Sequence, residues 1–129
     1  MSRLLKTLAL TMGVACVAIG FLHIALGNDA VPDMAEAGVT ADSLSRFFGA
    51  IFAGYGAAWI WAARQDPIPA LAVRWLAGVF LLGVVGRLVS LAVHGWPHWF
   101  QIVLTGIEMA MPPLLFWLAD ADEKRAGAV

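Results

Sequence analysis

Four apolar runs decide what this chain can fold into, because about 20 apolar residues in a helix cross the hydrocarbon core of a membrane. The runs cover residues 7–27, 44–63, 71–93 and 99–119. Backbone groups in lipid must be paired inside a helix or a closed barrel, and no run alternates apolar and polar residues as a barrel strand does. The sequence therefore predicts an all-α, integral membrane four-helix bundle, up-down-up-down, forming a single domain over residues 1–129.

The composition is that of a membrane protein. The chain is 61% hydrophobic and 13% charged, whereas soluble domains are about 45–50% apolar and about 25% charged. Arg3 and Lys6 before the first run resemble the start of a secretory signal, but the run is longer than the roughly 7–15 residues of a signal's apolar region. We therefore expect residues 7–27 to remain as a transmembrane helix.

The distribution of basic residues predicts the orientation. Those on the side of the N-terminus are Arg3, Lys6, Arg64, Arg74, Lys124 and Arg125. Arg46 is alone on the other side, so the positive-inside rule places both termini in the cytoplasm and the acidic 28–43 connector outside. Trp residues near both ends of the runs fit an aromatic belt. The expected location is a cell inner membrane, crossed several times.

Two charges lie inside apolar runs, Arg87 in the third and Glu108 in the fourth. A charge in the middle of a bilayer costs about 2.5–3.5 kcal/mol on insertion scales, so it persists when it is paired, hydrated or used. The third and fourth runs are joined by the short 94–98 connector and are therefore antiparallel neighbours. We expect the two side chains to pair as a buried ion pair, because long side chains can close the difference in depth.

Helical spacing collects further polar residues around this pair. Ser90 follows Arg87 by three residues, and Gln101, Thr105 and Glu108 share one face of the fourth run. His23 and Arg46 are expected in the same leaflet. The candidate ligand-binding residues are thus His23, Arg46, Arg87, Ser90, Gln101, Thr105 and Glu108. Two arginines against one glutamate leave a spare positive charge unless Asp29 or Asp42 folds in, which suits an anionic head group.

Small residues and prolines predict local backbone features. Gly49, Ala53 and Ala57 recur at a spacing of four, as do Gly86 with Ser90 and Gly106 with Ala110. Such faces allow close approach of helices, within one bundle or between copies of the chain. Pro112 and Pro113 leave the carbonyls of Glu108 and Met109 without helical donors, which predicts either a kink that shapes the bundle or a hydrated pocket.

Several of these motifs together are similar to one known pattern. They are Ser45-Arg46-Phe47-Phe48-Gly49, Gly86-Arg87-Leu88-Val89-Ser90, Gly95-Trp96-Pro97 and Glu108. The chain resembles the bacterial four-helix membrane family catalogued as domain of unknown function 4345. The resemblance implies four spanning helices and a shared core of Arg46, Arg87 and Glu108, without an assigned activity. The general shape is also similar to the DoxX-like group, but no motif of that group's proposed redox roles carries over.

Two classes of function fit this pattern. The first is a non-enzymatic accessory subunit or a binder of lipid or another amphipathic molecule, with membrane lipid and a homo-oligomer or larger membrane complex as partners. The alternative is an intramembrane isomerase or cyclase with Glu108 as general acid/base, assisted by His23 or Tyr55. Two further possible roles of the Arg87–Glu108 pair are a structural clasp and a proton or ion path. No cofactor, metal or nucleic acid is expected.

Overall fold

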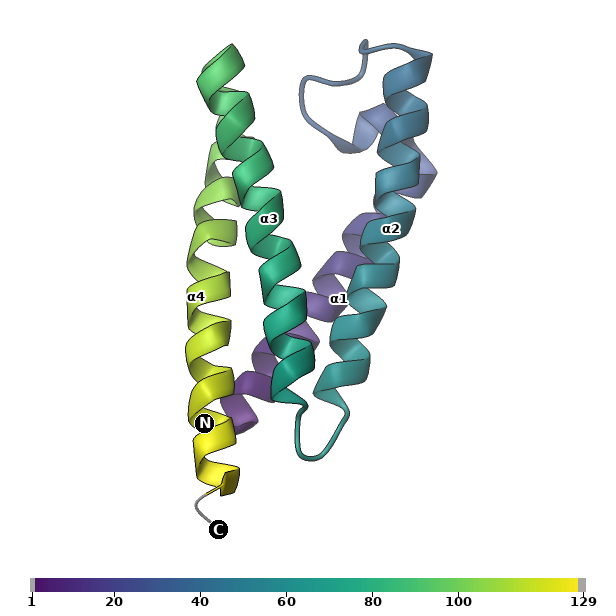
Figure 1. Ribbon diagram of the computed structural model, residues 1–129. Coiled ribbons are helices and arrows are strands. Elements are labelled where there is room, and N and C mark those ends of the chain that lie inside the picture. The colour runs from purple at the N-terminus through teal and green to yellow at the C-terminus, as the bar shows by residue number, and fades with distance from the viewer. Residues whose placement is uncertain (1, 128–129) are drawn as a thin grey trace. The chain divides into compact units, whose positions relative to one another are not determined.

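Four long helices make up the computed structural model, which describes residues 2–127 (Figure 1). They are α1 (Ser2–Leu26), α2 (Val39–Ala63), α3 (Ala70–His94) and α4 (Trp99–Gly127), with a short 3-10 helix, η1 (Gly27–Ala30), after α1. Residues 2–127 contain no strand. The all-α prediction is confirmed.

Three of the helical segments are long and apolar enough to cross a membrane: Arg3–Ala30, Ala70–His94 and Trp99–Arg125. The predicted length and apolar character are confirmed for these three. The α2 helix has 25 residues but carries Arg46, Tyr55 and two tryptophans, and it does not reach the same hydropathy. Its crossing, the orientation and the inner-membrane location stay predictions.

The helices extend beyond the apolar runs. The α2 helix begins at Val39 rather than at residue 44, and α4 continues to Gly127 rather than ending at 119. Hydropathy marks only the part of a helix that avoids water, whereas alanine, glutamate, lysine and arginine are good helix formers in any solvent. The charged end of α4 is therefore helical although it is not apolar.

The chain divides into two compact units, and each is described by itself. The α1–α2 unit is Thr7–Arg64, and the α3–α4 unit begins at Gln65 and includes the first turn of α1. The prediction of a single domain over residues 1–129 concerns the whole chain and stays a prediction.

Glycines set the packing of the α1–α2 unit. A methyl group on Gly20 would lie 2.5 Å from the carbonyl oxygen of Gly49, and one on Gly56 would lie 2.6 Å from that of Gly13. The two backbones are therefore in direct contact at both levels, as the small face of α2 predicted. A Cβ at Gly86 or Gly106 would meet nothing within 4 Å in the described residues, so close packing at these two glycines stays a prediction.

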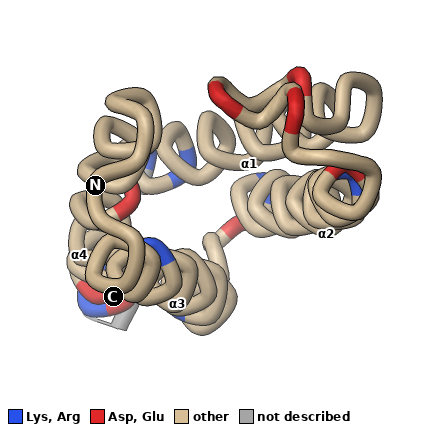
Figure 2. Tube along the Cα trace, turned by 90° about the horizontal axis from the view of Figure 1, so that it is seen from above, with Lys and Arg blue, Asp and Glu red and all other residues tan. Residues whose placement is uncertain are grey.

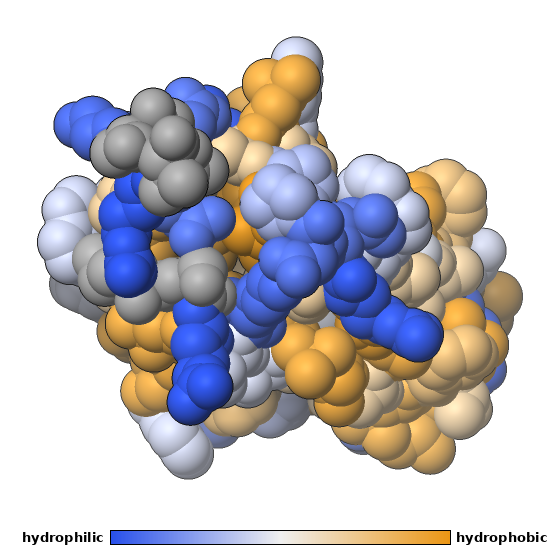
Figure 3. Space-filling model, turned by 90° about the horizontal axis from the view of Figure 1, so that it is seen from below, coloured by the Kyte–Doolittle hydropathy of each residue, from blue (hydrophilic) through white to orange (hydrophobic). Residues whose placement is uncertain are grey.

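Charged contacts lie at the end of the α3–α4 hairpin that is far from its connector. Arg74 near the start of α3 donates to Asp120, and its Nη1 donates to Glu123 Oε2 at 3.0 Å. Lys6 Nζ lies 3.3 Å from Asp66 Oδ1. Hydrophilic side chains gather on this face of the molecule (Figure 3). The charged end of α4 is thus held against α3 by ion pairs.

Candidate functional site

Arg87 and Glu108 form the centre of the α3–α4 unit's polar site. Arg87 Nε donates to Glu108 Oε2 at 2.5 Å, and Nη2 donates to Oε1 at 3.1 Å. The guanidinium and the carboxylate therefore pair through two parallel hydrogen bonds, the strongest geometry for these groups. The pairing follows the prediction, but its burial is not confirmed: the Arg87 side chain is 35% exposed and that of Glu108 16%. The exposure arises because Arg87 also lines an open groove.

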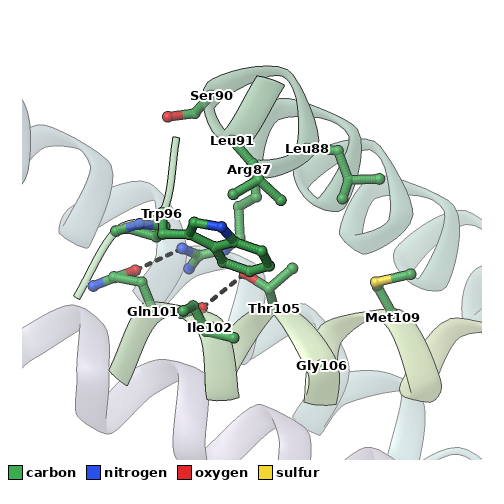
Figure 4. A pocket seen from close by; sticks show the side chains of 11 residues that line it. Arg87, Leu88, Ser90, Leu91, Trp96, Gln101, Ile102, Thr105, Gly106 and Met109 are labelled. Carbon is green, nitrogen blue, oxygen red and sulfur yellow. Dashed lines mark hydrogen bonds between the residues drawn. The ribbon is translucent and has the colours of Figure 1, made fainter. Parts of the chain in front are cut away.

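Gln101 holds the remaining side of the guanidinium. Arg87 Nη1 donates to Gln101 Oε1 at 2.6 Å, and the hydroxyl of Thr105 donates to the backbone carbonyl of Gln101 at 2.7 Å. Because the amide oxygen faces Arg87, the amide NH2 group points away from it (Figure 4). Gln101 thus orients Arg87 and presents its own NH2 donors.

A groove of about 440 Å³ opens beside this pair, within the range of about 300–1,000 Å³ that is common for small-molecule sites. Predicted residues on its wall are Arg87, Ser90, Gln101 and Thr105, whereas Glu108 does not line it. Ser90 sits at the edge with its hydroxyl turned away from the guanidinium (Figure 4). The other lining side chains are mainly apolar: Leu88, Leu91, Trp96, Pro97, Ile102 and Met109.

Trp96 is the lining residue that sequence reasoning missed, because a tryptophan near the end of an apolar run indicates an interface anchor. Its indole ring lies across the groove beside Arg87 (Figure 4). Gly95 has a φ of 85°, which glycine adopts without strain, and this turn brings the chain back over the end of α3. The Gly95-Trp96-Pro97 motif was the signal in the sequence that could have identified Trp96.

Arg46 lies in the α1–α2 unit, where it caps a helix. Its Nη1 donates to the carbonyl of Ile24 at 2.5 Å and to that of Ala25 at 3.2 Å, both in the last turn of α1. Terminal carbonyls of a helix have no helical donor, so the guanidinium satisfies them. Its Nε also donates to Asp42 Oδ2 at 2.7 Å. The spare positive charge considered from the sequence is therefore neutralised by Asp42.

Asp42 also secures the residue after α1. Its Oδ1 accepts a hydrogen bond from the backbone N–H of Asn28 at 3.0 Å, and the side-chain amide of Asn28 donates to the carbonyl of Gly38 at 3.0 Å. Figure 2 shows a basic position beside an acidic one at the start of α2, with further acidic positions on the connector. We call Asn28, Asp42 and Arg46 the connector latch.

We expect the connector latch to respond to acid. Hydrogen bonds from Arg46 and from the Asn28 N–H hold the pKa of Asp42 below its ordinary 3.8. A lowered pKa in the folded state means that the stabilisation is present above the unfolded-state pKa and is lost as pH falls through the folded-state value. An NMR titration of the Asn28 amide proton should show a midpoint below 3.8 that rises in Arg46→Gln. An unchanged midpoint in that variant would contradict the latch.

His23 and Tyr55 complete the predicted residues, and both belong to the α1–α2 unit. His23 Nδ1 lies 2.8 Å from the carbonyl of Ile19 in its own helix. The Tyr55 ring stacks on Phe52, with ring centroids 6.1 Å apart, and meets Trp59 edge-on at 6.2 Å. It stays a prediction that His23 or Tyr55 assists Glu108. It also stays a prediction that His23 and Arg46 join Arg87 in one ligand site.

Comparison with known proteins yields one match. No curated protein and no solved structure matches the chain. The sequence pattern of the family described as a domain of unknown function (DUF4345) matches residues 4–119. That match covers α2 and α3 completely, most of α1 and α4, and every residue of the Arg87 site. The chain therefore belongs to the DUF4345 family.

Proposed function

We propose that this protein is a multi-pass inner-membrane protein that binds a membrane lipid or another amphipathic molecule in the α3–α4 groove. The observation that carries the proposal is an open, largely apolar groove whose wall includes Arg87, the cation paired with Glu108. Apolar walls suit an acyl or isoprenoid chain, and a few fixed polar groups suit its head group.

Arg87 supplies the polar contact. A guanidinium has five N–H groups, and Arg87 spends three of them on Glu108 and Gln101. The other two N–H groups of Arg87 have no acceptor among residues 2–127. A ligand oxygen in the groove would satisfy them, which supports a binding role beyond a structural clasp.

The enzymatic alternative receives less support. Both Glu108 oxygens accept hydrogen bonds from Arg87, and Glu108 does not line the groove. A general acid/base must reach the proton that it transfers. The roles as accessory subunit, as homo-oligomer or as part of a larger membrane complex stay predictions.

Filling the groove should remove the bound molecule. Gly106 lines the groove, and a Cβ there meets no atom within 4 Å, so Gly106→Leu places a side chain in the space without a clash at its first carbon. We expect native mass spectrometry of minimally delipidated protein to show an amphiphile on the wild type and at least a tenfold lower occupancy in Gly106→Leu, equivalent to about 1.4 kcal/mol.

Gly83→Leu is the matched control, because Gly83 also lies in a spanning helix with open space at its Cβ but does not line the groove. It should retain the amphiphile. Wild-type protein without any bound amphiphile, or equal occupancy in Gly106→Leu and Gly83→Leu, would refute the proposed function.

A further inference from the structure

The polar wall of the α3–α4 groove specifies the head group that it takes. We propose that the ligand carries an uncharged polar end that accepts hydrogen bonds, such as the carbonyl oxygen of an ester or a quinone, and not an anionic head group. The inference rests on the proposed function and adds the chemical class of its ligand.

The first step is an account of donors and acceptors. The side-chain groups in this site that can only accept are the Glu108 carboxylate and the Gln101 amide oxygen, and Arg87 occupies both. The polar groups on the wall that can only donate are the outer edge of the Arg87 guanidinium, the NH2 group of Gln101 and the indole N–H of Trp96. Two hydroxyls also line the groove: that of Ser90 turns away from Arg87, and that of Thr105 donates to the carbonyl of Gln101. The complementary ligand group is an acceptor.

The second step is an account of charge. Between residues 82 and 110 the formally charged side chains are Arg87 and Glu108, which neutralise each other. An anion would leave the site with a net negative charge among apolar walls, and uncompensated charge there is costly.

The third step concerns the charge that could have balanced an anion. The sequence left one arginine unpaired, which favoured an anionic head group. Asp42 accepts from Nε of Arg46 at 2.7 Å, and two carbonyls in the last turn of α1 accept from its Nη1. Arg46 and Arg87 thus each pair with a carboxylate, so an acceptor without charge is the better match.

The test compares two amphiphiles that share one acyl chain and differ in the charge of the head group. Delipidated wild-type protein in an uncharged detergent at pH 9 is titrated with methyl oleate and with oleate, and binding is read by native mass spectrometry. At this pH the fatty carboxylate is ionised, and histidines are neutral. We expect methyl oleate to bind at least about tenfold more tightly, the ratio that corresponds to about 1.4 kcal/mol.

Further arms identify the source of the carbonyl group and test the wall. A diacylglycerol and a decyl-substituted benzoquinone both carry uncharged carbonyls. The one that binds more tightly identifies the kind of molecule that supplies the carbonyl group. Gln101→Glu keeps an oxygen for Arg87 but replaces the NH2 donors with a charged acceptor. It should weaken methyl oleate binding about tenfold, and Gly83→Leu should not.

The outcomes separate the two proposals. Oleate binding as tightly as methyl oleate, or more tightly, would overturn the inference and leave the proposed function standing. Binding of methyl oleate that is unchanged in Gln101→Glu would also overturn it. If none of the four amphiphiles binds, both proposals fail.

Discussion

Glu108→Ala is expected to lower the free energy of unfolding by about 3 kcal/mol, the lower end of the range for breaking a buried ion pair, because Arg87 is 35% exposed. The loss arises because Arg87 cannot give up its proton and would be left as an unpaired cation in an apolar hairpin. Arg87→Ala should cost less, since an isolated carboxyl group can take up a proton. Chemical unfolding in mixed micelles, followed by tryptophan fluorescence, measures both.

Two comparisons separate this effect from a general loss of charge. Asp66→Ala breaks the contact with Lys6, in which the Asp66 side chain is 88% exposed, and should change stability by less than about 1 kcal/mol. The double variant Arg87→Glu with Glu108→Arg should recover most of the stability lost in each single variant. If Glu108→Ala unfolds like the wild type, the pair does not hold the hairpin.

Gly56→Ala is expected to destabilise the α1–α2 unit by about 1–3 kcal/mol, the usual cost of inserting a methyl group where no space exists. The new Cβ would lie 2.6 Å from the carbonyl oxygen of Gly13 and 2.7 Å from the backbone nitrogen of Val17. Backbone atoms cannot rotate away as a side chain can, so the helices must separate. Thermal unfolding of the α1–α2 contact, monitored by cross-linking of cysteines placed on both helices, measures the loss.

Gly54→Ala is the matched control on the same helix, because a Cβ at Gly54 meets nothing within 4 Å. Alanine is a better helix former than glycine by about 1 kcal/mol. We therefore expect Gly54→Ala to be at least as stable as the wild type. Equal effects of the two substitutions would show that helix propensity, and not contact between backbones, decides the outcome.

The α3–α4 pair was predictable because its determinants are local in sequence. A short connector makes the two helices antiparallel, and helical spacing then places Arg87 opposite Gln101 and Glu108. The groove was not predictable, since it depends on the turn at Gly95 and on how Trp96 lies over the hairpin. Side-chain periodicity carries no information about either.

The role of Arg46 could not be read from its spacing. Its partners include backbone carbonyls of α1, more than 20 residues earlier, at Ile24 and Ala25. Reaching them requires the chain to leave α1 through Gly27, whose φ is 59°, and to return at Asp42. A backbone acceptor has no signature in the sequence, so a charged residue that caps a helix looks the same as one that binds a ligand.

The connector latch fixes the geometry of the α1–α2 turn through the side chains of only a few residues. Asn28, Asp42 and Arg46 set where α1 ends and where α2 starts, and Gly38 enters only through its backbone carbonyl. Pro32, Asp33 and the 35–37 segment are exposed. We therefore expect the intervening segment to tolerate substitution and insertion while the two helices keep their register.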